Sequence, residues 1–313
     1  MGYEEFKQAF MEAVENEIKE QGIEGVSVSN EEVVSPDGMN DRMLVKMEGS
    51  SISMAFRFQE IYNNFDGEIK DHAITIVDSI RENLDVREKE EGVKDLIKDY
   101  EKAKDHLLLR LIPGDSPAVA EAPHEMIEDM ALVVNLDLVG FSDDNGRACV
   151  IVTNPLLSMY GVSEKELFDV ARANSMVQEP LKFEPLQSMI ASLIKDSDMS
   201  VPDMDDVAFI ATNASGFNGA SVLGYPEFTK EAEKVMGGSF YMIPSSVHEF
   251  ILLKDDGNIS AKTINNMIKD VNENVLQPRD KLSAQCYHYD AKKKKLENGL
   301  KYDKAKEKKA GAR

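Results

Sequence analysis

The chain alternates between two hydrophobic periodicities, and this alternation constrains its fold more than any other feature. Phe6, Phe10, Val14 and Ile18 recur at every fourth position, which is typical of the buried face of an amphipathic helix. Residues 50–58 instead alternate apolar and small side chains with a period of two, as a half-buried strand does. Both patterns recur in mixed order, so the sequence predicts an α+β fold with antiparallel or mixed sheets packed by helices.

The length of 313 residues favours two domains. We expect residues 1–112 to form an N-terminal domain in which a helix precedes a three-stranded antiparallel meander and further helices. Its strands are predicted at residues 25–34, 39–48 and 50–58, and its later helices at residues 67–84 and from Val93 onward. Residues 113–123 contain three prolines and small side chains, which is typical of a linker.

Residues 124–290 are predicted to form a C-terminal α+β domain. Ser163 and Glu166 are spaced as a capping box that opens a helix, and Ser260 is expected to cap another. Residues 207–212 and 220–224 are predicted to pair as a hairpin around the loop 213–219. Strands are also expected at residues 239–243, 247–253 and 283–289.

Charge is distributed unevenly between the two predicted domains and the C-terminal segment. Residues 291–313 hold ten basic and three acidic residues, which leaves 26 basic and 54 acidic residues upstream from totals of 36 and 57. The segment has almost no apolar content, so it is predicted to be a disordered basic tail. A body this acidic repels phosphate backbones, so the sequence argues against nucleic-acid binding except through the tail.

The sequence indicates a cytoplasmic location. The N-terminal residues are acidic and lack the basic start and apolar run of an export signal, and no apolar stretch approaches the roughly 20 residues that span a bilayer. Cys149 and Cys286 are the only cysteines, which favours reduced thiols over a disulfide framework and excludes a cysteine-based structural zinc site.

The segment Pro244-Ser245-Ser246-Val247-His248-Glu249 places hydroxyls, an imidazole and a carboxylate close together. A hydrolase hypothesis makes Ser245 or Ser246 the nucleophile and His248 its base, with Glu249 alongside. The alternative is a strand–turn–strand corner whose serines bond to backbone, since catalytic partners usually come from separate elements. The sequence favours the corner, because no Gly-x-Ser-x-Gly elbow is present.

The loop 213–219 is the second candidate, because loops carry recognition more often than cores do. Asn213 and Asn218 are its candidate ligand contacts, although it lacks the Lys-Ser/Thr ending of a phosphate-binding loop. The five histidines are scattered singly and the acidic residues 196–206 lack calcium-loop spacing, so neither a metal nor another cofactor is predicted.

Three motifs resemble an uncharacterised bacterial family, common in clostridia, that is known as a domain of unknown function. They are Asn154-Pro155-Leu156-Leu157, the helix ending Ala171-Arg172-Ala173-Asn174, and the run Phe240–Glu249 that contains Pro244-Ser245-Ser246-Val247-His248-Glu249. The resemblance covers nearly the whole chain except the basic tail. It implies a cytosolic accessory protein and no established activity, cofactor or catalytic residue.

The sequence therefore favours a non-catalytic binding or regulatory protein with an unknown protein or small-molecule partner and no membrane contact. One alternative is the hydrolase hypothesis at Ser245, Ser246, His248 and Glu249. The other is a nucleic-acid-associated factor that acts through the tail.

Overall fold

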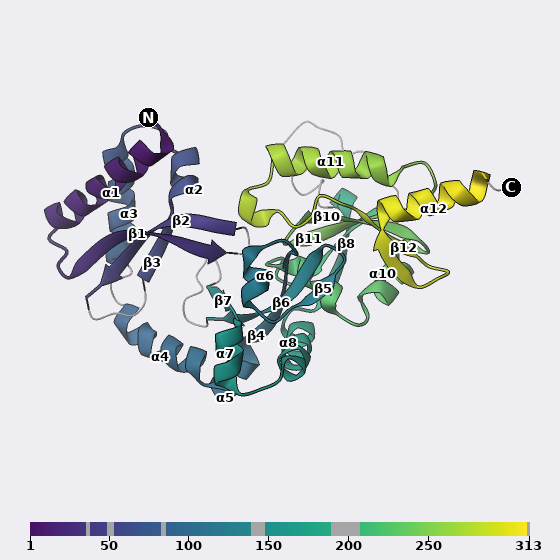
Figure 1. The fold of residues 1–313 in the computed structure, drawn as a ribbon, viewed down its shortest axis with the longest axis horizontal. Helices are drawn as coiled ribbons and strands as arrows, with labels where there is room; N and C mark the ends of the chain where they lie inside the picture. The colour runs from purple at the N-terminus through teal and green to yellow at the C-terminus, as the bar shows by residue number, and fades with distance from the viewer. Residues whose placement is uncertain (36–37, 49–52, 83–85, 139–147, 189–206, 312–313) are drawn as a thin grey trace. The chain divides into compact units, whose positions relative to one another are not determined.

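The computed structural model describes all residues except 36–37, 49–52, 83–85, 139–147, 189–206 and 312–313, and it divides into two compact units (Figure 1). The first unit comprises Met1–Asp99 with Leu138–Ala148, and the second comprises Tyr100–Asp137 with Cys149–Arg313. The predicted acidic loop 196–206 lies outside the described residues. Both units combine helices with antiparallel sheets, so the predicted α+β class is confirmed.

The first unit contains the predicted helix and meander. α1 (Tyr3–Glu20) precedes β1 (Val26–Ser35), β2 (Gly38–Met47) and β3 (Ser53–Arg57), which pair in that order as an antiparallel sheet. The helices α2 (Phe58–Asn63), α3 (Ile69–Glu82) and α4 (Val86–Lys98) follow.

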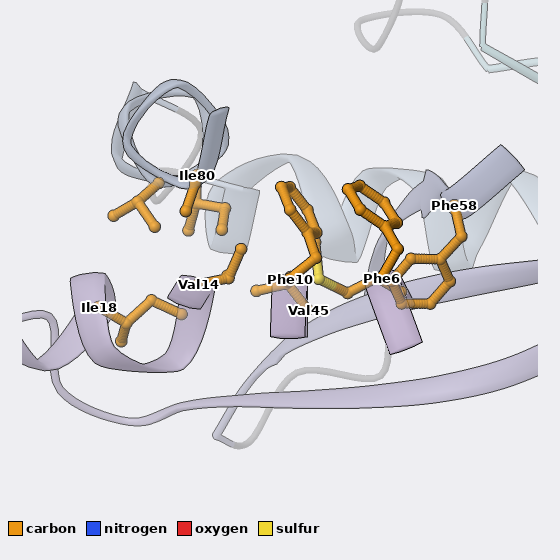
Figure 2. Close-up of a cluster of buried hydrophobic side chains, with 10 residues drawn as sticks. Phe6, Phe10, Val14, Ile18, Val45, Phe58 and Ile80 are labelled. Atoms are coloured by element: carbon orange, nitrogen blue, oxygen red, sulfur yellow. The ribbon is translucent and has the colours of Figure 1, made fainter. Parts of the chain in front are cut away.

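The core of the first unit forms where α1 packs on α3 and on the sheet. The predicted stripe Phe6, Phe10, Val14 and Ile18 is buried, and its side chains lie beside those of other elements (Figure 2). Val45 of β2, Phe58 of α2 and Ile80 of α3 belong to the same cluster, and all three are almost fully buried. The four-residue spacing read from the sequence therefore marks the buried face of α1.

The second unit holds two antiparallel sheets within the described residues. The smaller sheet has the order β4-β6-β5, with β7 also paired to β6, and the larger has the order β13-β12-β10-β11-β9-β8. The strands of the smaller sheet are β4 (Leu107–Pro113), β5 (Glu125–Ile127), β6 (Met130–Asp137) and β7 (Cys149–Ile151). Those of the larger sheet are β8 (Leu181–Pro185), β9 (Ala208–Asn213), β10 (Phe240–Ser246), β11 (Glu249–Lys254), β12 (Tyr287–Asp290) and β13 (Lys295–Asn298).

Two helices of the second unit begin at the capping residues that the sequence predicts. The predicted caps form, because Ser163 Oγ accepts from the Glu166 amide at 3.2 Å and Ser260 Oγ accepts from the Thr263 amide at 3.2 Å. The α-helices are α5 (Tyr100–Ala103), α6 (Pro117–Glu121), α7 (Asn154–Tyr160), α8 (Glu164–Gln178), α10 (Phe228–Met236), α11 (Ala261–Asn274) and α12 (Gly299–Gly311). The 3₁₀ helices are η1 (Lys104–His106), η2 (Gly219–Gly224) and η3 (Pro278–Asp280).

The boundary between the units falls between Asp99 and Tyr100, before the expected linker 113–123. Pro113 is the last residue of β4 and is paired with Met130, and Pro117 occupies the first turn of α6. Proline is tolerated at both places because neither requires its missing amide hydrogen. Residues 113–123 thus belong to the second unit, where Ala118 and Ala122 are buried.

The segment 291–311 is folded, in contrast to the predicted disorder. β13 pairs with β12, and α12 follows it and packs against α11 (Figure 1). Leu300 and Tyr302 pack against a buried cluster that includes Tyr241 and Ile264. These few apolar contacts suffice because the lysines project their charged ends to solvent, so a low apolar content did not imply disorder here.

No helix among the described residues is long and apolar enough to cross a membrane.

Candidate functional site

The 244–249 corner, residues Pro244–Glu249, joins β10 to β11 in the larger sheet. Ser246 pairs with Glu249 across the turn, and the register shifts by a bulge between Pro244 and Ser246. Bulges re-aim side chains and are frequent beside functional sites, so the positions of the corner's polar atoms decide between the two hypotheses.

Both serine hydroxyls of the corner are used locally. Ser246 Oγ accepts from the backbone amide of His248 at 3.0 Å. Ser245 Oγ donates to Glu249 Oε1 at 3.1 Å. A nucleophilic serine needs its hydroxyl within hydrogen-bond reach of a base, and neither hydroxyl is bonded to the imidazole of His248.

His248 connects three segments of the second unit. Its Nδ1 accepts from the Asn218 amide at 3.1 Å, and its Nε2 lies 3.5 Å from Asp280 Oδ1. The neighbouring Val247 amide donates to the Asp280 carbonyl at 2.9 Å. Both ring nitrogens therefore face protein groups from other segments, which makes His248 a cross-link between the corner, the 213–219 loop and η3.

The 213–219 loop does not lead into the predicted strand. Residues 219–224 form the 3₁₀ helix η2 instead, so the prediction that residues 220–224 pair with β9 in a hairpin is wrong. The reason is the close approach of Gly219, where an added Cβ would lie closer than 3.0 Å to Thr212 Oγ1 and to the His248 carbonyl oxygen. Only glycine lets the backbone pass there, and the passage turns the chain away from the sheet.

Asn213 and Asn218, the predicted ligand contacts, are both buried. Asn213 Oδ1 accepts from the Gly216 amide at 2.8 Å, and its Nδ2 donates to the Phe217 carbonyl at 2.9 Å. Asn218 adopts a positive φ of 50°, which directs its amide at His248. Asn213 therefore closes the loop on itself, and the backbone amide of Asn218 ties the loop to the corner.

A cavity of about 570 Å³ lies elsewhere in the second unit, and we call it the Asp129 cavity. Residues from four separate stretches of the chain line it. The polar ones are Asp115, Asp129, Asn272, Lys281 and Ser283, and Met126 is among the apolar ones.

Asp129 is held at the tip of the β5–β6 hairpin. The preceding residue, Glu128, has a φ of 55°, a conformation that L-residues adopt at a cost. The Gly114 amide donates to the Asp129 carbonyl at 2.9 Å. A Cβ on Gly114 would come within 2.7 Å of that oxygen, so glycine is required for the approach. The backbone around Asp129 is thus fixed from both sides.

The Asp129 carboxylate is oriented by two hydroxyl groups. Ser283 Oγ donates to Asp129 Oδ2 at 2.9 Å, and the Tyr287 hydroxyl donates to Asp129 Oδ1. Burial, the nearby carboxylate and its hydrogen bond raise the pKa of Tyr287, so the phenol stays protonated. Asn272 Nδ2 in turn donates to the Ser283 carbonyl at 3.1 Å, which connects α11 to the residues that orient Asp129.

The sequence did not indicate this cavity. Asp129 is separated from Ser283 by 154 positions and from Tyr287 by 158. Each residue taken alone fits an ordinary hairpin tip, loop or strand, and only the folded chain brings them together. The one local signal is the Ser283–Tyr287 spacing, which is too common to predict a site.

A second polar cluster surrounds His288, which is fully buried on β12. His288 Nε2 lies 2.9 Å from Asp255 Oδ2, which also accepts from the Tyr302 hydroxyl at 3.1 Å. The Tyr302 ring stacks on the imidazole with centroids 3.4 Å apart. His288 Nδ1 is buried and lacks a hydrogen-bond partner within the described part of the chain. Asp303 of α12 accepts from the Ala261 amide at 2.7 Å and thereby caps α11.

We expect the stability of the protein to fall on acidification because of His288. Burial lowers the pKa of His288, and the Asp255 carboxylate opposes the shift without cancelling it. In the unfolded state the histidine has an ordinary pKa near 6.5. On acidification it is therefore protonated in the unfolded state at a pH where it is still neutral in the folded state. The contribution is complete above about pH 6.5 and is lost as the pH falls below it.

Urea unfolding at pH 7.5 and pH 5.5 tests this expectation. The free energy of unfolding of the wild type should fall more between the two values than that of His288→Phe, which cannot titrate. An equal fall in both proteins would contradict it.

Comparison with known proteins gives a family and no activity. A sequence model of a family of unknown function, DUF5688, matches residues 3–291. No curated protein and no solved structure matches the chain. Among the described residues, no group of three or more histidine, cysteine, aspartate or glutamate side chains is arranged to hold a metal ion.

Proposed function

The chain belongs to the family of unknown function DUF5688, and we propose from its own geometry that it is a non-catalytic binding protein whose small polar ligand occupies the Asp129 cavity. The resemblance noted from the sequence is consistent with this membership and extends as far as residue 291.

The proposal rests on the Asp129 cavity, whose carboxylate is already held in a fixed orientation. Ligand sites are concave, measure roughly 300–1,000 Å³, and place a few fixed polar groups in a mostly apolar lining. The Asp129 cavity, at about 570 Å³, lies within that range. Its carboxylate is oriented by Ser283 and Tyr287 before any ligand arrives, and such preorganisation lowers the cost of binding.

The chemistry of the lining groups supports binding without turnover. Ser283 is the hydroxyl that would serve as a nucleophile, yet its partner is a carboxylate, a much weaker base than imidazole. No histidine or cysteine is among the residues that line the cavity. The imidazole of His248 is held by Asn218 and Asp280, so it supports the corner as architecture.

A cytoplasmic location is part of the proposal. Neither Cys149 nor Cys286 forms a disulfide, and reduced cysteines are the usual state in reducing compartments.

A thermal-shift screen against amino acids, short peptides, sugars and nucleosides tests the proposed function. A ligand present at 100 times its Kd stabilises the folded state by about 2.7 kcal/mol, which raises the melting temperature measurably. Ala284→Trp places an indole on the rim of the cavity and should abolish the shift. Ala305→Trp on the exposed side of α12 is the matched control and should retain it.

The outcome of the screen decides the proposal in either direction. A ligand that stabilises the wild type and Ala305→Trp, but not Ala284→Trp, supports it. The proposal fails if no compound in the screen stabilises the protein, or if Ala284→Trp responds as the wild type does. It also fails if the bound compound is converted to a product.

A further inference from the structure

The Asp129 cavity collects three charged side chains, and their signs define the ligand. We propose that the ligand is a basic amino acid or a short basic peptide, with ammonium or guanidinium groups beside Asp115 and Asp129 and a carboxylate beside Lys281. This inference rests on the proposed function, because it names the chemical class of the molecule held in the same cavity.

No ion pair joins these three side chains to each other or to another charged side chain in the part of the chain that the structure describes, and the partners of Asp129 are the neutral hydroxyls of Ser283 and Tyr287. Elsewhere in the protein, cations meet carboxylates directly. Lys7, Arg172 and Lys294 lie 2.6, 2.7 and 2.6 Å from Asp41, Glu125 and Glu233, respectively. Charges that line a cavity without an ionic partner favour a ligand that supplies the opposite signs, because such a ligand pairs with them directly.

The numbers of positive and negative side chains around the cavity indicate which class of ligand fits it. Two carboxylates face the cavity against one ammonium, so the complementary ligand carries two cationic groups and one anionic group. A basic amino acid has this composition, with an α-ammonium, a side-chain cation and a carboxylate. The overall net charge of −21 acts in the same direction, since an acidic surface raises the local concentration of cations.

The apolar part of the lining suits an aliphatic side chain. Met126 and Leu282 line the cavity with Pro113 and Ala284. Met126 is 51 % exposed, and methionine adapts its shape to irregular partners. Methylene groups between the cations of the ligand would cover this exposed thioether, which an ion or a sugar would not do.

Calorimetric titration of the full chain at low ionic strength tests the inference. The probes are L-arginine, L-lysine, the dipeptide Lys-Lys, argininamide and norleucine. We expect L-arginine, L-lysine or Lys-Lys to bind. Argininamide lacks the carboxylate and norleucine lacks the side-chain cation, so each should bind about tenfold more weakly than its parent amino acid. If a free amino acid binds more tightly than Lys-Lys, the ligand is a free amino acid. If Lys-Lys binds more tightly, the ligand is a peptide.

Two variants assign each end of the ligand. Asp115 makes no side-chain hydrogen bond among the described residues, so Asp115→Asn should fold normally and weaken all cationic probes about tenfold. Lys281→Gln should remove the preference for L-arginine over argininamide, because the partner of the carboxylate is then gone. Lys269→Gln on the outer face of α11, where Lys269 pairs with Glu273, is the control and should bind as the wild type does.

The possible results separate this inference from the proposed function. Binding of basic probes that weakens in Asp115→Asn and loses carboxylate selectivity in Lys281→Gln supports both. A sugar, nucleoside or neutral amino acid that binds in the cavity while basic probes do not overturns the inference and leaves the proposed function standing. If the basic probes bind equally well to the wild type and to both variants, the inference is wrong, because the binding is then general attraction to the acidic surface.

Discussion

Replacing Gly219 by alanine is expected to lower the free energy of unfolding by about 3 kcal/mol. The new Cβ would collide with Thr212 Oγ1 and with the His248 carbonyl oxygen, which are themselves hydrogen-bonded at 2.8 Å. The Asn213 backbone nitrogen lies on the same side at 3.0 Å. Because two of these three atoms belong to the backbone, no rotation of a flexible side chain relieves the contact. The change therefore displaces η2 from β9 and from the 244–249 corner.

Chemical unfolding monitored by circular dichroism measures this loss. Gly92→Ala is the matched control, because Gly92 lies within α4 and a Cβ there meets no atom within 4 Å. That variant should be stabilised by about 0.5–1 kcal/mol through the helix preference of alanine. If Gly219→Ala unfolds at the same urea concentration as the wild type, the close approach of η2 to the corner is wrong.

Replacing Phe10 by alanine is expected to cost about 3–5 kcal/mol of stability in the first unit. Phe10 has no solvent exposure, and its ring stacks on that of Phe6 with centroids 5.4 Å apart. Figure 2 shows both rings at the centre of the cluster, between Val14 and Phe58. Truncation removes the ring from a packed interior that cannot collapse fully around the vacancy, so the transfer and cavity costs add.

The same unfolding experiment checks this second prediction. Gln8→Ala is its control, since Gln8 is exposed on the same helix and should change stability by less than about 0.5 kcal/mol. Comparable unfolding of the two variants would show that the stripe on α1 does not form the core.

The sequence predicted those elements whose signals are local. The stripe on α1 and the meander of the first unit are encoded by period, and the caps at Ser163 and Ser260 by residue type and spacing. β10 and β11 were also expected as strands, and the structure shows that they pair with each other. In each case one short window contains the whole cause, so no knowledge of distant residues was needed.

The remaining features depend on contacts that no window contains. Residues 219–224 have the apolar composition of a strand, but the crowding at Gly219 against Thr212 and His248 turns them into η2. Pro113 and Pro117 were interpreted as parts of a linker, although Pro113 ends a strand and Pro117 starts a helix. The Asp129 cavity is the extreme case, because its walls come from stretches more than 150 positions apart.

The anchoring of α12 sets an order of events during synthesis of the second unit. Asp303 caps the Ala261 amide across 42 positions, and β13 covers the free edge of β12. At roughly 5–20 residues per second, the ribosome adds Asp303 about 2–8 seconds after Ala261. Until then the nascent chain carries an α11 that is capped by Ser260 alone and a sheet that β13 does not yet cover. An open sheet edge invites pairing with neighbouring chains, so this interval is when self-association competes with folding.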